Sequence, residues 1–212
     1  MLPVTNAWTF ALAAFALIAI PGPSVLFVIG RSLSLGRKGG LLSVVGNALG
    51  MIPAIVLVSL GVGSIVAESI VVFSIIKFIG AGYLVYLGIQ AIRHRNDHTE
   101  TAASPQTHPS SFRLLREGFF VGITNPKTIV FFVAVLPQFV SYGHGMIPLQ
   151  MAALGMIFFG IALASDSIWA LSASTARAWF ARNPKQLSRM GAGGGVMMIG
   201  LGGALTLAGN KS

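Results

Sequence analysis

The sequence predicts an all-α polytopic membrane protein with six transmembrane helices, arranged as one domain over residues 1–212 and as a 3+3 inverted repeat. Of its 212 residues, 54% are hydrophobic and only 9% are charged, whereas a soluble domain carries about 25% charged residues. The charges are clustered, which leaves apolar segments of the roughly 20 residues that one bilayer crossing needs. The two halves of the chain also match each other in sequence.

Six hydrophobic segments follow one another along the chain, three before residue 93 and three after a polar segment that begins there. Only Lys77, Lys127 and Asp166 place a charged side chain inside them. The first segment is long and has no basic region before it, so we interpret it as a span and not as a cleaved signal peptide. The predicted spans are residues 7–30, 39–62, 69–92, 118–140, 147–173 and 190–209.

The orientation follows from the basic residues of the short loops. Eleven of the 14 Lys and Arg lie in the loops between the first and second, third and fourth, and fifth and sixth spans, and the connections near Glu68 and His144 contain none. Lys and Arg accumulate in cytoplasmic loops. We therefore expect the three basic loops in the cytoplasm and both termini outside. The basic residues contact lipid headgroups, and no motif indicates nucleic-acid binding.

Residues 93–111 differ in composition from the rest of the chain, because Pro, Ser, Thr and His dominate. This composition predicts a flexible cytoplasmic linker. His94 and His98 are four residues apart and His108 follows, so a metal site is the alternative interpretation. A solvated linker is favoured because nothing there predicts a helix that holds ligands in place, and we predict no metal site. The chain also has no Cys.

The two halves align without a gap when the chain is shifted by 105 positions. Pro21 then falls on Pro126, and residues 48–52 fall on residues 153–157. Because each half has three spans, the second copy enters the membrane from the opposite face, as in the inverted repeats of many secondary transporters. The alternative is that two membrane segments merely share a composition.

Two helix breaks occupy corresponding places in the first and fourth spans. Pro21-Gly22-Pro23 interrupts the first, and Asn125-Pro126-Lys127 interrupts the fourth. A proline frees backbone groups that hydrocarbon cannot satisfy, so such breaks line a cavity or bond to neighbouring helices. In a cavity, the helix N-termini after the breaks offer amides and a positive dipole end to an anion. Simple kinks are the alternative.

Asp166 is the strongest single candidate for function. It lies about as deep in the membrane as the two breaks, where an ionisable group is costly and faces the interior of the bundle. Its helical face carries Ala162, Ala170 and Ala173, and the face of Asn47 is similarly lined by small residues. The alternative is a structural pair of Asp166 with Lys77 or Lys127. The small pairs Gly46/Gly50 and Gly191/Gly195 predict close helix packing or a homodimer face.

Nothing in the spans forms a catalytic set, since all four His lie in loops and a single intramembrane carboxylate cannot form a dyad. We therefore expect no enzyme activity. Four short motifs are more specific. They are Ile20-Pro21-Gly22-Pro23, Gly80-Ala81-Gly82-Tyr83-Leu84-Val85-Tyr86-Leu87-Gly88, Thr124-Asn125-Pro126-Lys127 and Leu136-Pro137-Gln138-Phe139.

These motifs, with six spans in 212 residues, resemble the lysine-exporter/RhtB family of amino-acid exporters over nearly the full chain. The resemblance implies a secondary transporter of the inner membrane that exports an amino acid, small and neutral or basic, driven by the proton gradient and without a cofactor. Related groups handle cations, so a cation or metal exporter is one alternative. A non-transporting membrane scaffold is another.

Under this interpretation the breaks and three polar residues bind the substrate. Lys127 and the helix ends at the breaks attract the substrate carboxylate, Asp166 meets its amine or carries the coupled proton, and Asn47 supplies a neutral hydrogen bond. The predicted binding residues are Pro21, Gly22, Pro23, Asn47, Asn125, Pro126, Lys127 and Asp166.

The loop charges lead to a test of topology. Single cysteines introduced near Ser104 and Lys185 should react only with a membrane-permeant thiol reagent, because these loops are cytoplasmic. Cysteines near His144 and Ser212 should react with an impermeant reagent added outside. Cytoplasmic labelling at both termini would contradict the inverted repeat as well as the orientation.

Overall fold

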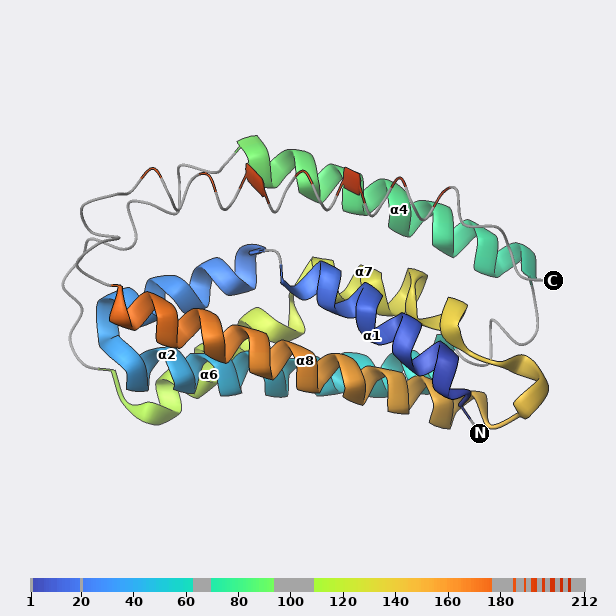
Figure 1. Ribbon diagram of the computed structural model, residues 1–212, viewed down its shortest axis with the longest axis horizontal. Coiled ribbons are helices and arrows are strands. Elements are labelled where there is room, and N and C mark those ends of the chain that lie inside the picture. Colours follow the sequence, from blue (N-terminus) through green and yellow to red (C-terminus); the bar gives the residue numbers. More distant parts are fainter. Residues whose placement is uncertain are drawn as a thin grey trace.

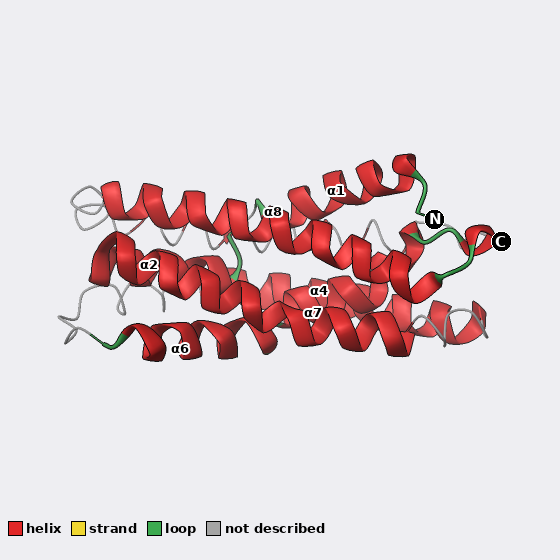
Figure 2. Ribbon diagram, turned by 90° about the horizontal axis from the view of Figure 1, so that it is seen from below, coloured by secondary structure: helices red, strands yellow, loops and turns green. Residues whose placement is uncertain are grey.

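The computed structural model describes residues 2–19, 21–62, 70–93 and 109–176, together with residues 185, 189, 192, 193, 196, 199, 200, 203 and 206. Within these residues the fold is all-α, as the sequence predicts, and contains no strand. The elements are α1 (Val4–Ile18), α2 (Pro23–Leu57), a π-helical turn η1 (Val58–Val62), α4 (Ile70–Arg93), α6 (Ser111–Ile123), α7 (Pro126–Ala134), two 3₁₀ turns η2 (Leu136–Phe139) and η3 (Tyr142–His144), and α8 (Ile147–Thr175). Figures 1 and 2 show that these helices run roughly along the long axis of the molecule.

The first helix break separates α1 from α2. Proline is well tolerated at the first position of a helix, where its missing N–H would have no helical partner, and α2 begins with Pro23 after the extended Gly22. Further on, Gly36 adopts φ 73° and ψ −167°, a conformation that residues with a Cβ rarely adopt. The chain reverses there, so α2 consists of two segments on either side of Gly36 (Figure 1).

The second break separates α6 from α7, and it has the same construction. Pro126 is the first residue of α7, and Asn125 is its N-cap. Residues Ser111–Ile123 and Pro126–Phe139 form an apolar pair bent by 44° at this point. Among the described residues, Pro23–Gly61 and Ile147–Thr175 are each long and apolar enough to cross a membrane, and the bent pair makes a third such segment if it is counted as one. The six spans and the inverted repeat stay predictions.

The segment of α2 after Gly36 packs closely on α6 through glycines of both helices. A Cβ on Gly46 would lie 2.2 Å from the Leu115 carbonyl oxygen, and one on Gly122 would lie 2.1 Å from the Asn47 carbonyl oxygen. Small residues allow such backbone contact between membrane helices. Close packing at Gly46/Gly50 is therefore confirmed, and its partner pair is Gly118/Gly122. Residues 191 and 195 of the other predicted pair lie outside the described residues.

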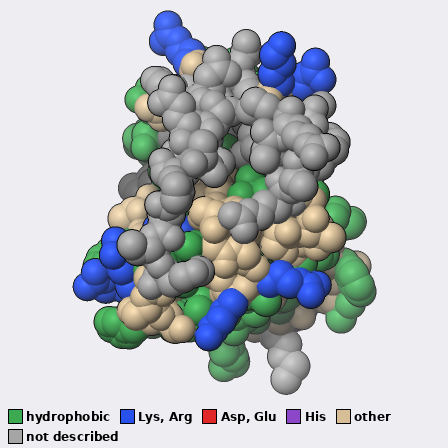
Figure 3. Space-filling model, turned by 90° about the vertical axis from the view of Figure 1, so that its left-hand side faces the viewer, with side chains coloured by type: hydrophobic (Ala, Val, Ile, Leu, Met, Phe, Trp, Pro, Cys, Tyr) green, Lys and Arg blue, Asp and Glu red, His purple; other side chains and the backbone are tan. Residues whose placement is uncertain are grey.

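An aromatic core joins α1, α7 and α8. Phe10, Phe131, Phe132 and Phe158 are almost completely buried, and the rings of Phe132 and Phe158 meet edge to face with centroids 4.9 Å apart, a favoured geometry for aromatic pairs. α4 lies at the edge of the bundle beside α7 (Figure 1). The end of the molecule that contains the Gly36 turn carries Lys and Arg side chains around its rim (Figure 3).

The glycine contact between α2 and α6 yields a stability test. Gly122→Ala forces a methyl group against the Asn47 carbonyl, and we expect it to lower the free energy of unfolding by about 1–3 kcal/mol. The matched control is Gly160→Ala in α8, because a Cβ there meets nothing within 4 Å. Thermal unfolding in detergent measures both variants. A Gly122→Ala protein that melts at or above the temperature of Gly160→Ala would show that the contact is not required.

Candidate functional site

A group of buried polar side chains lies at the two helix breaks and on the helices beside them. In an apolar bundle such groups are stable only when they are hydrogen-bonded. Each side chain in the group is less than one-tenth exposed. We call the group the polar cluster, and its members are Ser24, Asn47, Asn125, Lys127, Thr128 and Asp166.

Lys127 completes the first break from the opposite half of the chain. In a continuous helix the Leu17 carbonyl would accept from the N–H of residue 21, but Pro21 has none. The Lys127 ammonium donates to this carbonyl at 2.7 Å. The same side chain lies against Gly22, where an added Cβ would meet Lys127 Cδ at 3.2 Å and Nζ at 3.3 Å. Gly22 therefore leaves the space through which the lysine reaches the break.

Asn125 ties the second break to the first. Its side-chain oxygen accepts the Lys127 backbone N–H at 3.1 Å, which caps α7, and its Nδ2 donates to the Ser24 hydroxyl at 3.0 Å in the first turn of α2. Its backbone N–H donates at 3.2 Å to the Gly122 carbonyl, which Pro126 leaves without its usual donor. The starts of α2 and α7 are thus adjacent in space and joined by a hydrogen bond.

Asp166 of α8 pairs with Asn47 of α2. Asn47 Nδ2 donates to Asp166 Oδ2 at 2.9 Å. Asn47 Oδ1 is also buried, and it has no hydrogen-bond partner among the described residues. Asp166 and Lys127 interact electrostatically. Ala162, Ala170 and Ala173 are buried on the same face of α8 as Asp166, which confirms the predicted small face.

The cluster combines one carboxylate, one buried cation and an unpaired carbonyl oxygen. Its charges are complementary to a cationic group at Asp166 and to an anionic group beside Lys127. No group of three His, Asp or Glu side chains that suits a metal occurs in the described part of the chain. His94, His98 and His108 lie outside the described residues, as does the side chain of Lys77, so the predicted alternative pair of Lys77 with Asp166 is not described.

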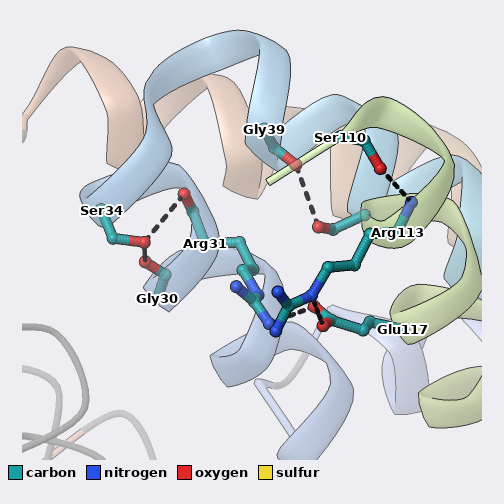
Figure 4. A network of polar contacts seen from close by, with 8 residues as sticks. Gly30, Arg31, Ser34, Gly39, Ser110, Arg113 and Glu117 are labelled. Carbon is teal, nitrogen blue, oxygen red and sulfur yellow. Dashed lines mark hydrogen bonds and ion pairs between the residues drawn. The ribbon is translucent and has the colours of Figure 1, made fainter. Parts of the chain in front are cut away.

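A second polar network, near the Gly36 turn, links the first segment of α2 to α6 (Figure 4). Glu117 forms ion pairs with Arg31 and with Arg113, whose Nε lies 2.8 Å from Glu117 Oε1. The Arg31 guanidinium also lies over the Phe27 ring at 5.3 Å. Arg31, which indicated only topology in the sequence, therefore also connects two helices, whereas Arg113 pairs with Glu117 within α6.

The structure brings the sequence-predicted residues of both breaks together. Pro21, Pro23 and Pro126 create the breaks, and Gly22, Asn125 and Lys127 contact one another or the opposite break. Asp166, which pairs with Asn47, interacts electrostatically with Lys127 at the second break. Ser24, Thr128 and the Leu17 carbonyl were not predicted. The carbonyl could have been found by counting four residues back from Pro21.

Comparisons with known proteins give a consistent result. Residues 15–209 match the family described as LysE type translocator. An uncharacterised membrane protein of Vibrio cholerae is 37% identical over 200 residues, which cover 94% of this chain and 95% of that protein. A homoserine/homoserine lactone efflux protein of Salmonella typhimurium is 32% identical over 208 residues, covering 97% of this chain and 98% of the relative. No solved structure matches the chain.

The Lys127–Leu17 contact leads to a stability test of the cluster. Lys127→Met leaves the Leu17 carbonyl without this donor and Asp166 without its positive neighbour, and we expect it to reduce the free energy of unfolding by about 3 kcal/mol. The double variant Lys127→Met/Asp166→Asn should regain part of this loss, because no uncompensated charge remains. Lys38→Met, at an exposed position, is the control. Unfolding in detergent measures all three variants, and equal stability of Lys127→Met and Lys38→Met would rule out the structural role.

Proposed function

The chain belongs to the LysE type translocator family, and on that premise we propose that it exports an amino acid across the cell inner membrane in exchange for protons. A member of a translocator family is a transporter and not an enzyme, and its apolar helices and membrane-protein relatives place it in a membrane. The relative described as a homoserine/homoserine lactone efflux protein covers almost the whole chain, which supports a small neutral substrate.

The observation that carries this proposal is the buried Asn47–Asp166 pair beside two broken helices. Secondary transporters place substrate sites at broken helices near the bilayer midplane. Here one carboxylate and one ammonium lie in the same polar cluster, which suits a zwitterion. In our proposal Asp166 binds the substrate amine or carries the coupled proton. Lys127 and the starts of α2 and α7 then attract the substrate carboxylate.

The remaining features of the proposal concern the membrane. We propose six spans, with the basic segments around Arg31 and Arg113 in the cytoplasm and both termini outside. Two halves related by inversion then rock about the polar cluster and expose it to either side in turn. The Arg31–Glu117 ion pair lies at the cytoplasmic end in this topology, where it holds the first segment of α2 against α6. No described feature favours a metal exporter or a scaffold.

Asp166→Asn tests the proposal. In proteoliposomes with a proton gradient, we expect it to reduce accumulation of homoserine at least about tenfold, because the charge that binds the amine or takes up the proton is gone. Ser167→Ala, which changes the next side chain on α8, is the control and should transport normally.

Binding measured on the same purified protein separates the two roles of Asp166. Intact binding with lost accumulation identifies the proton carrier, and weakened binding identifies the amine ligand. Asp166→Asn protein that binds and accumulates homoserine like the parent would refute both roles.

A further inference from the structure

Asn47 Oδ1 is a buried acceptor with no hydrogen-bond partner among the described residues, although Nδ2 of the same side chain is hydrogen-bonded to Asp166. The Asn47 side chain is completely buried, and leaving a buried acceptor unpaired is costly. Natural structures rarely leave such an atom unsatisfied, and the exceptions reflect strain, a role in function, or a bound water or ion. The atom therefore indicates a hydrogen-bond donor that arrives from outside the protein.

The position of this atom defines the donor. Oδ1 and Nδ2 of Asn47 are bonded to the same carbon, and Nδ2 donates to Asp166 Oδ2, so Oδ1 lies in the neighbourhood of the Asp166 carboxylate. One group placed there meets two acceptors, one charged and one neutral. A carboxylate favours a cationic donor, whose hydrogen bonds are stronger than those between neutral groups. To use both acceptors, the cation must carry at least two N–H bonds.

Taking the proposed export of an amino acid as its basis, we infer that the substrate is bound through its ammonium by Asp166 and Asn47 Oδ1 together. The site then selects primary and secondary amines and rejects tertiary and quaternary ones. Asn47 is a specificity-determining residue in this arrangement, because its Oδ1 accepts a hydrogen bond from a second N–H of the ammonium. Asp166 requires only one N–H. The Lys127 ammonium at the second break interacts electrostatically with Asp166. In this arrangement the carboxylate of the substrate lies on the Lys127 side of the site.

Stepwise N-methylation of one probe tests this inference. Homoserine and its N-methyl, N,N-dimethyl and N,N,N-trimethyl derivatives carry three, two, one and no N–H bonds on the ammonium. For the full-length protein in detergent, calorimetric titration should show similar affinity for the first two, a drop of at least about tenfold at the dimethyl derivative, and a further drop at the trimethyl derivative. Tenfold corresponds to about 1.4 kcal/mol, less than a charge-assisted hydrogen bond contributes.

Asn47→Leu separates hydrogen bonding from steric crowding, because leucine is similar in size but accepts no hydrogen bond. In this variant the drop at the dimethyl derivative should disappear, and only the trimethyl derivative should bind more weakly. If Asn47→Leu does not fold, an even decline or no decline across the series on the parent protein still overturns the inference.

Each outcome of the series has a separate meaning. Binding of homoserine with an even decline at every methyl group, or with no decline, overturns the inference and leaves the proposed function intact. A drop at the dimethyl derivative that persists in Asn47→Leu also overturns it. Failure of all four compounds to bind removes the proposed amino-acid substrate, and the inference with it.

Discussion

The arrangement of the site depends on one carbonyl group that proline deprives of its donor. Pro21 ends α1 without an N–H for the Leu17 carbonyl, and the Lys127 ammonium takes the place of that N–H. Hydrocarbon offers no donor for this carbonyl, and here a neighbouring helix supplies one. The start of α7 must therefore lie beside the end of α1, and the hydrogen bond between Asn125 and Ser24 fixes the same relation from the other side.

The buried lysine imposes the next requirement. A cation inside a membrane protein needs an anion within its electrostatic reach, and Asp166 of α8 is such a group. That carboxylate in turn accepts from Asn47. The position of Asn47 relative to the other helices is set by direct backbone contact with Gly118 and Gly122 of α6. The glycine contact between α2 and α6 thus positions Asn47, which hydrogen-bonds Asp166, the anion near Lys127. Asn47 Oδ1 has no hydrogen-bond partner among the described residues.

The sequence alone predicts the class and the parts of this site but not their connections. Helix breaks can be predicted because proline acts on its own backbone, and Asp166 stands out because charges inside apolar segments are rare. The partners of these residues depend on tertiary packing. Gly118/Gly122 face Gly46/Gly50 only after α6 has docked on α2. Likewise, the shift of 105 places Pro21 on Pro126, whereas the observed N-caps Gly22 and Asn125 are 103 residues apart, because the first break contains two prolines and the second only one.

The most direct test of the account is the distance between Lys127 Nζ and the Leu17 carbonyl carbon in lipid bilayers. Solid-state NMR dipolar recoupling on protein labelled with ¹⁵Nζ-lysine and ¹³C-carbonyl leucine measures it, and Lys127→Arg removes the relevant label while keeping the charge. An N···O distance of 2.7 Å places nitrogen and carbon within about 4 Å. The account predicts strong dephasing in the parent protein that is lost in Lys127→Arg. Equal dephasing in both proteins would show that the lysine does not complete the break, and would contradict the account.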